Sequence, residues 1–219
     1  MFPSEIIEDI YGKNILNIGI LTGPSHAEQI VVESPTSLVI SSSDLAFSRD
    51  MQELLSNDNF RVYSSTDIIG VQLGGAVKNV ISIASGIAWG LGFRENTVAA
   101  ILTRGIYEIK KLGKEIGIKK DTLNGLAGLG DLMATSFSLD SRNRYIGEQI
   151  AKGKDIATIT KNMKMNAEGV ETSKSLYLLS QKAGVDMPIC EKVYNIIYKK
   201  EDPAKAISQL MKRELRSEF

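Results

Sequence analysis

The hydrophobic pattern of the first 66 residues alternates between two periods. Short runs rich in β-branched residues predict strands, and the stretches between them have helical spacing, with Ser43 or Asp44 placed to cap the second one. The predicted strands are 17–23, 36–42 and 60–66, and the predicted helices are 24–32 and 45–57. This alternation is typical of a parallel α/β layer. Because three strands make a small sheet with open edges, we interpret this part as the last portion of a larger sheet.

Beyond this point the strand signal almost disappears and helical periodicity takes over. Thr66 or Asp67 is expected to cap a long helix that runs to about Trp89. Further helices are expected from Asn96 to about Gly113 or Gly117, and at 121–137 (in two pieces), 141–153, 155–163, 168–184, from Pro188, and from Pro203 after an Asp202 cap. We therefore predict an all-helical domain over 67–219. It should pack closely against 1–66, because the join between the two is short.

The stretch GVQLGGAVKNVISIASG places one charge, Lys78, in an otherwise apolar helix. Apolar residues cover nearly every face, so the helix is predicted to be buried all round. Gly74, Gly75 and Ala76 would let another backbone come close. A buried ammonium is costly, so Lys78 is expected either to act as a general base or Schiff-base amine, or to snorkel or pair structurally. This stretch alone leaves the two interpretations equally open.

A second stretch, GLAGLGDLMATS, leads small residues into Asp131. Thr135 follows four positions later, hence on the same helix face. A carboxylate beside a buried lysine would pair with it and orient it. The alternative is that Asp131 only caps the helix that follows, and the stretch by itself favours capping.

A third segment, SLDSRNRYIGEQI, begins a helix with Asp140 or Ser141 as the natural N-cap. Arg142 and Arg144 then lie in the first turn, where the helix dipole favours anions rather than cations. A bound phosphate or carboxylate would remove this conflict, so we favour an anion site here. The alternative is a solvated turn in which an arginine pairs with Asp140 or Glu148.

A fourth segment, LTGPSHA, turns a predicted strand into a helix. Ligands of parallel sheets bind outside the carboxyl ends of the strands, so this turn is well placed for binding. Ser25 has the alternative role of a helix cap. His26, the only histidine of the chain, is expected to be a surface residue rather than a catalyst. Without a second histidine or a cysteine cluster, no transition-metal site is expected.

Composition narrows the possible partners. The chain has 26 basic and 26 acidic residues, so its balanced charge points neither to nucleic acid nor to an anionic membrane. The single cysteine, Cys190, cannot form an intrachain disulfide, which makes a reducing cytoplasm the default. We expect no run long enough to span a bilayer, and the first residues lack a signal-peptide pattern. A cytoplasmic enzyme, a soluble binding module and a subunit of an assembly remain.

Six motifs occur in order along the chain: GPSHA, IIGVQLGGAVKNVISIASGI, TRG, GLAGLGDLMATS, SRNR and AEGVET. Together they closely resemble the bacterial NAD(P)-dependent glycerol-3-phosphate dehydrogenases, over essentially the whole chain. The resemblance implies part of a Rossmann-like sheet followed by a mostly α-helical domain like the C-terminal one of 6-phosphogluconate dehydrogenase. It also implies interconversion of sn-glycerol 3-phosphate and dihydroxyacetone phosphate by hydride transfer with NAD or NADP. The enzyme would be a cytoplasmic homodimer that supplies phospholipid synthesis.

The resemblance also assigns roles to residues of these motifs. Lys78 is similar to the proton acceptor for the substrate hydroxyl, Asn79 to an electrostatic helper, and Asp131 to the carboxylate that orients the lysine and the substrate. The implied substrate-binding residues are Gly23, Ser25, Lys78, Asp131, Thr135, Ser141, Arg142 and Asn143. The implied cofactor-binding residues are Ala27, Arg142, Asn166 and Glu168.

The sequence departs from this family at its beginning. The family has a strand with a G-x-G-x-x-G turn that holds the pyrophosphate, and a substrate-contacting lysine upstream of GPS, and neither is found in this sequence. We therefore expect the carboxyl-terminal part of the enzyme, with 1–66 ending the dinucleotide-binding domain and 67–219 forming the helical substrate domain. Such a chain would have little or no activity alone. The alternative is a non-catalytic remnant that binds a phosphorylated metabolite or dimerises.

Overall fold

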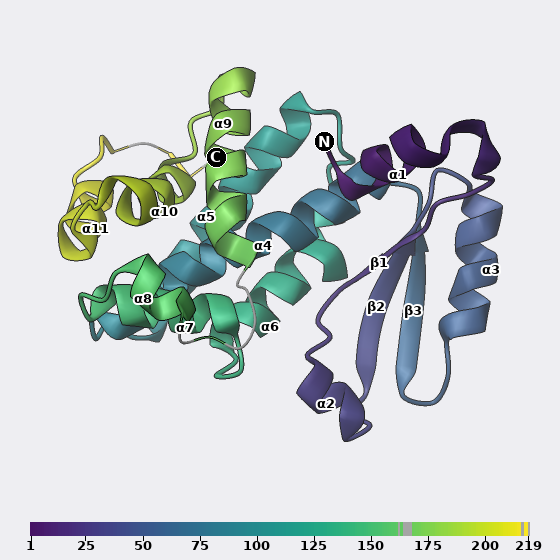
Figure 1. Ribbon diagram of the computed structural model, residues 1–219, viewed down its shortest axis with the longest axis horizontal. Helices are drawn as coiled ribbons and strands as arrows, with labels where there is room; N and C mark the ends of the chain where they lie inside the picture. The colour runs from purple at the N-terminus through teal and green to yellow at the C-terminus, as the bar shows by residue number, and fades with distance from the viewer. Residues whose placement is uncertain (162, 164–167, 216, 219) are drawn as a thin grey trace.

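The computed structural model describes residues 1–161, 163, 168–215 and 217–218. A small sheet with its helices forms one side of the molecule and a bundle of helices forms the other (Figure 1). The long helix α4, Ile68–Gly90, leads from the sheet into the middle of the bundle. The predicted fold class, a partial Rossmann-like sheet followed by a mostly helical region, is confirmed.

The sheet has the order β1-β2-β3, with β1 at Ile20–Thr22, β2 at Thr36–Ser41 and β3 at Phe60–Ser65. Strands β2 and β3 are parallel, as predicted, but β1 runs antiparallel to β2. The prediction of an all-parallel layer was therefore wrong for the first strand. The reason is the connection: α2, Ala27–Val31, is little more than one turn and too short for a parallel crossover. The eleven-residue α3, Leu45–Leu55, does provide one.

One face of the sheet packs on α3 through a small apolar cluster that contains Leu38, Ile40 and Val62. The carboxylate of Asp44 caps α3 by accepting hydrogen bonds from the amides of Ala46 and Phe47, which confirms the capping expectation. Helix α1, Pro3–Tyr11, and the short 3-10 turn η1, Gly12–Asn14, were not predicted from the sequence.

Helix α4 is the centre of the main hydrophobic core, and α5, α6, α7, α9 and α10 all pack on it. Asp67 caps it by accepting a hydrogen bond from the amide of Gly70. The same carboxylate accepts from the amide of Lys119 at 2.9 Å and the hydroxyl of Thr122 at 2.5 Å, which ties the segment 119–122 to the start of α4. By length and composition α4 could cross a membrane, so the expectation that no run is long enough was wrong. Most of α4 is buried inside the protein, as in a core helix.

The other elements of the helical side follow α4 in chain order. They are α5 (Glu95–Glu115), η2 (Thr122–Asn124), η3 (Leu126–Gly130), α6 (Asp131–Phe137), α7 (Arg142–Ala151), α8 (Ile156–Lys161), α9 (Glu168–Ala183), α10 (Pro188–Lys199) and α11 (Pro203–Met211). Segment η3 is a π-helical turn, a rare conformation often found at functional sites. The expected starts of α7 at Ser141 and of α11 at Asp202 are confirmed, since both side chains accept a capping hydrogen bond.

A buried carboxylate holds the start of α10 against α5. Glu108 is 3% exposed and accepts hydrogen bonds from the amides of Ile189, at 2.8 Å, and Cys190, at 3.2 Å. Burial raises the pKa of Glu108 from 4.5 to about 7, against the opposing effect of these two amides. Burial, followed by the charge of Glu108, likewise raises the pKa of the Cys190 thiol.

We expect Glu108 to make the folded state less stable as pH rises. Its folded pKa of about 7 lies above the ordinary 4.5, so between these values the folded state binds more protons than the unfolded state. The stability that Glu108 contributes is therefore fully present below pH 4.5 and is lost as pH rises through 7, by at most about 3 kcal/mol. Urea unfolding at pH 5 and pH 8 measures this, with Glu108→Gln as the non-titrating variant. The free energy of unfolding of wild type relative to that of Glu108→Gln should be lower at pH 8 than at pH 5. The same difference for Glu115→Gln, at an exposed position, should not depend on pH. An unchanged difference for Glu108→Gln would contradict the prediction.

Candidate active site

The central feature of the site is an ion pair between α4 and α6. Lys78 Nζ lies 2.6 Å from Asp131 Oδ2, across 53 positions of sequence. The close approach of the two segments depends on Gly74, because a Cβ there would overlap the carbonyl group of Ala127 in η3. The Asp131 side chain is 3% exposed and that of Lys78 is 21% exposed. The pairing interpretation of Asp131 is therefore the one the structure supports.

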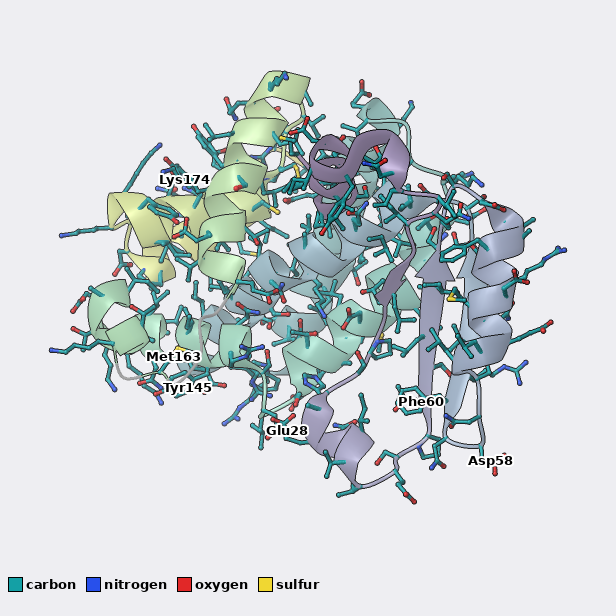
Figure 2. The ribbon with its side chains drawn as sticks, turned by 45° about the vertical axis from the view of Figure 1, so that its right-hand side comes forward. Glu28, Asp58, Phe60, Tyr145, Met163 and Lys174 are labelled. Atoms are coloured by element: carbon teal, nitrogen blue, oxygen red, sulfur yellow. The ribbon has the colours of Figure 1, made fainter. Side chains whose placement is uncertain are left out.

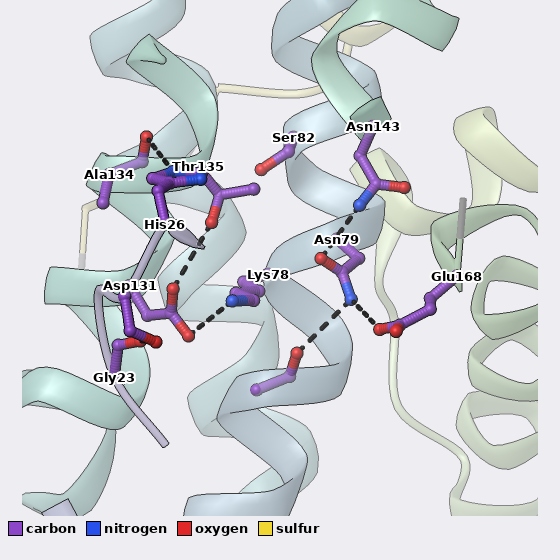
Figure 3. Close-up of polar contacts among 12 residues, drawn as sticks. Gly23, His26, Lys78, Asn79, Ser82, Asp131, Ala134, Thr135, Asn143 and Glu168 are labelled. Carbon is purple, nitrogen blue, oxygen red and sulfur yellow. Dashed lines mark hydrogen bonds and ion pairs between the residues drawn. The ribbon is translucent and has the colours of Figure 1, made fainter. Parts of the chain in front are cut away.

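Asp131 does not cap its helix, so the capping interpretation was wrong. The N-cap position of α6 is Gly130, and Asp131 is the first helical residue, with its side chain directed to Lys78. Its other oxygen accepts a hydrogen bond from the hydroxyl of Thr135 at 3.4 Å (Figure 3). Burial raises the pKa of the Asp131 carboxyl above its ordinary 3.8, while the charge of Lys78 acts in the opposite direction. The ion pair thus places the Lys78 amine against a buried carboxylate whose affinity for a proton is raised.

A line of amides connects α4 to α7 and α9 beside this pair. Asn143 Nδ2 donates to Asn79 Oδ1 at 2.9 Å, and Asn79 Nδ2 donates to Glu168 Oε2 at 3.3 Å. The amide of Gly169 donates to Asn143 Oδ1 at 3.1 Å. These bonds fix the orientation of both asparagine side chains and hold Glu168 at the start of α9 (Figure 3).

The two arginines of the α7 start have different surroundings. Arg144 lies over the ring of Trp89, pairs with Glu148 at 2.9 Å and donates to the carbonyl of Phe137 at 2.5 Å, so it follows the structural alternative. Arg142 is exposed and lines the cavity next to Lys78. Ser141, which is 3% exposed, uses its oxygen to accept from the amide of Arg144. The favoured anion site therefore rests on Arg142 rather than on both arginines.

The turn after β1 brings the fourth segment to the same place. Gly23 has a φ of +136°, which L side chains rarely adopt, and the Ser25 hydroxyl donates to its carbonyl at 2.9 Å. Ser25 does not cap α2, because the N-cap position there is His26. The His26 ring is half-buried, with Nε2 3.4 Å from the carbonyl oxygen of Ala134. The expectation of a surface histidine was thus incomplete, since this side chain borders the site (Figure 3).

A cavity of about 720 Å³ unites these groups, a size that suits a small ligand. The predicted residues that line it are Ser25, Ala27, Lys78, Asn79, Asp131, Thr135, Ser141, Arg142, Asn143 and Glu168. Gly23 does not line it, and Asn166 lies outside the described residues. His26, Glu28 and Tyr145 line the cavity but were not predicted to do so. Figure 2 shows Glu28 and Tyr145 on the same side of the molecule. The GPSHA motif was the only sequence signal that pointed toward the first two.

A second cavity, of about 810 Å³, begins on the other side of the same lysine. Lys78 and Glu168 line both cavities, and Leu73, Val77 and Leu176 give the second an apolar wall. Within the described residues no group of three or more His, Cys, Asp or Glu side chains is arranged to hold a metal ion. The chemistry available at the site is therefore proton transfer at the Lys78–Asp131 pair. This pair lies between the end of the first cavity that holds Arg142 and the apolar wall of the second cavity.

Comparisons with known proteins agree over both sides of the molecule. The family model for the NAD-dependent glycerol-3-phosphate dehydrogenase C-terminus matches residues 67–208, and the model for the N-terminus of the same enzymes matches residues 1–48. The glycerol-3-phosphate dehydrogenase [NAD(P)+] of Solidesulfovibrio magneticus is 44% identical over 218 residues, and that of Chlorobium chlorochromatii is 46% identical over 213 residues. These matches cover 100% and 97% of this chain.

A solved structure gives the same result. The glycerol-3-phosphate dehydrogenase of Coxiella burnetii superposes with a TM-score of 0.91 at 36% identity, covering 96% of this chain and 64% of that one. The chain likewise spans 66% and 64% of the Solidesulfovibrio and Chlorobium relatives. With a family model matched along most of its length, this chain belongs to the NAD-dependent glycerol-3-phosphate dehydrogenase family.

Proposed function

We propose that this chain carries the substrate site of a dehydrogenase that interconverts sn-glycerol 3-phosphate and dihydroxyacetone phosphate with NAD or NADP. The observation that carries the proposal is the Lys78–Asp131 pair, 2.6 Å apart, in the wall of a cavity whose mouth holds Ser141, Arg142 and Asn143. The names of the Solidesulfovibrio and Chlorobium relatives support the reaction class.

The pair supplies the proton chemistry. In the reducing direction, the Lys78 ammonium donates a proton to the oxygen of the ketone as that oxygen gains negative charge. In the oxidising direction, the hydroxyl proton returns to the pair. Burial raises the pKa of Asp131, which makes its carboxylate a stronger acceptor beside the amine that takes up that proton. Asp131 also holds the amine in place, while Thr135 holds the second oxygen of Asp131.

The other end of the cavity suits the phosphate. Arg142 and the start of α7 supply a guanidinium and the positive end of a helix dipole, which favour a phosphate oxygen. Asn143 and Ser141 already have hydrogen-bond partners in the protein, so their part is to shape this end as well as to contact the ligand. Ser25 and Gly23 would close the site from the β1 side.

The nicotinamide end of the cofactor fits the second cavity. Its apolar wall suits a planar ring, and it meets the substrate cavity at Lys78 and Glu168. Residues of this chain that would contact the cofactor are Ala27, Arg142 and Glu168, and Asn166 is included by resemblance. When bound, NAD or NADP would accept or donate the hydride at the carbinol carbon. We also propose, on family membership, the division at residues 66 and 67, a cytoplasmic homodimer and a role in phospholipid precursor supply.

The test is NAD(P)H oxidation with dihydroxyacetone phosphate, together with calorimetric titration of the chain with sn-glycerol 3-phosphate and with NADH. We expect the chain alone to bind the phosphate ester and to show little or no turnover, because its sequence contains no G-x-G-x-x-G turn for the pyrophosphate. Fusing the part of the Solidesulfovibrio relative that has no counterpart in this chain to this chain should restore turnover. If sn-glycerol 3-phosphate does not bind, the proposal is wrong. Binding without turnover in the fusion would favour a phosphometabolite-binding module.

A further inference from the structure

Although the Arg142 end of the substrate cavity suits a phosphate, the summed charge of its lining opposes a phosphate dianion. Among the described residues, its lining carries two basic side chains and four acidic ones: Lys78, Arg142, Glu28, Asp131, Asp140 and Glu168. Tyr145 adds a phenol. One of the two cations, Lys78, is already paired with Asp131 at 2.6 Å. A phosphate ester that enters such a cavity meets an excess of negative charge, and this lowers its affinity unless the site gains a proton.

His26 is the group placed to gain that proton. An imidazole is the side chain that ordinarily changes its charge between pH 5 and 8, and this is the only histidine of the chain. Its ring lines the same cavity and is half-buried, between α2 and α6. One ring nitrogen, Nε2, lies 3.4 Å from the carbonyl oxygen of Ala134, so a proton on that atom has an acceptor. The ring is close enough to Asp131 for its charge to act on that carboxyl.

We propose that His26 is a further binding residue of this site, which takes up a proton from solvent as a phosphate ester binds and supplies the positive charge that the cavity lacks. This inference rests on the proposed function only in so far as the ligand is a phosphate ester. The imidazolium then lies beside the Lys78–Asp131 pair and helps to keep Asp131 ionised while the ester is bound. The part of the affinity that His26 supplies therefore depends on pH.

Linkage gives the inference two matched consequences. If the ester binds more tightly to the protein with a charged His26, then the bound ester must hold the proton on His26 to a higher pH, by the same free energy. The first effect is measured on the ligand and the second on the histidine. A side chain that merely borders the cavity would produce neither.

The first experiment follows the ring resonances of His26 by NMR as pH is varied, and they need no assignment because no other histidine is present. Titrations are run on the wild-type chain alone, with saturating sn-glycerol 3-phosphate, and with glycerol as the control that lacks a phosphate. We expect the midpoint of the titration to move up by about half a pH unit or more with the ester and to stay in place with glycerol. An unmoved midpoint in the presence of bound ester would overturn the inference.

The second experiment measures the affinity for sn-glycerol 3-phosphate by calorimetry at pH 6.5 and pH 8.5. His26→Gln keeps a polar side chain without the charge, and His26→Lys keeps a charge at both pH values. We expect wild type to bind about fivefold or more tightly than His26→Gln at pH 6.5 and equally at pH 8.5, with His26→Lys remaining tight at both. The ester also changes its own ionisation between these pH values. Because this affects both proteins equally, it cancels in the ratio of the wild-type affinity to the His26→Gln affinity.

The outcomes separate this inference from the proposed function. If the ester binds and the wild-type to His26→Gln ratio does not change with pH, the proton goes to Asp131 or Glu168 or is not taken up, and the inference is wrong while the proposed function stands. If the ester does not bind at all, both are overturned.

Discussion

Lys78→Ala should abolish turnover of dihydroxyacetone phosphate in the fused protein, with kcat reduced by about 10²- to 10⁴-fold, the range for loss of a general acid or base. The physical reason is that no other described side chain donates a hydrogen bond to Asp131 Oδ2, the oxygen 2.6 Å from the amine. Without the amine, the ketone oxygen loses the proton donor that Asp131 holds in place. Binding of sn-glycerol 3-phosphate should weaken much less than turnover, because Arg142 and the start of α7 remain.

The matched control is Lys192→Ala. Lys192 forms an ion pair with Glu201 at the same 2.6 Å and has the same exposed side-chain fraction, 21%, on the far side of the helical bundle. Both variants therefore remove one half-buried ion pair, and only one of them should change kcat. Equal loss of turnover in the two variants would show that the effect is structural, and full turnover in Lys78→Ala would exclude Lys78 as the proton donor.

The same variant should change the stability of the chain with pH. Asp131 is buried and loses its cation in Lys78→Ala, so its pKa should rise further above the ordinary value. A carboxyl whose folded pKa is raised stabilises the protein at low pH and loses that contribution as pH increases. The free energy of unfolding of Lys78→Ala should therefore be closest to that of wild type at acidic pH and should fall increasingly below it toward neutral pH. The double variant Lys78→Ala/Asp131→Asn should not show this dependence on pH.

The sequence was sufficient for the helices of the bundle and for the main pair of the site. Helix ends carried local signals that act within a few residues: the Asp67 and Asp202 caps, the serine at 141 and the prolines that open α10 and α11. The pairing of Lys78 with Asp131 was accessible because a charge in an apolar helix needs a partner and the small residues of α4 and η3 allow close approach.

What the sequence did not predict depends on contacts between distant segments. The antiparallel direction of β1 follows from the length of α2, which was expected to be nearly twice as long. Arg144 is satisfied by Trp89, Glu148 and the carbonyl of Phe137, two of which no local pattern reveals. Glu108 caps a helix 81 positions later, and no short-range cap pattern contains it. His26 was expected at the surface because a lone histidine carries no periodic signal.

Gly86→Ala should destabilise the fold strongly, because it lies where α4 and α7 cross. A Cβ at Gly86 would overlap the carbonyl oxygen of Arg144 and lie 2.8 Å from its carbonyl carbon, which are backbone atoms and cannot rotate away. We expect the free energy of unfolding to fall by about 3 kcal/mol or more, the upper end for overpacking. The matched control is Gly75→Ala in the same helix, where a Cβ meets only the Thr22 hydroxyl at 3.1 Å. There the helix propensity of alanine should make the change neutral or stabilising by up to about 1 kcal/mol.

A glycine of α7, Gly147, faces α4 at the same crossing and allows a second test. A Cβ at Gly147 would lie 2.6 Å from the amide nitrogen of Ile87, so α7 closes on α4 through both glycines. If the two share one gap, Gly147→Ala alone should also be strongly destabilising. Introducing Gly147→Ala into the Gly86→Ala protein should lower the free energy of unfolding much less than introducing it into wild type, since the helices have already been forced apart. The same separation would stretch the 2.9 Å bond from Asn143 to Asn79 and move the start of α7 away from Lys78. Chemical denaturation of the four chains measures the coupling, and strict additivity would contradict the shared gap. Weaker binding of sn-glycerol 3-phosphate by any folded Gly86→Ala protein would link this crossing to the geometry of the site.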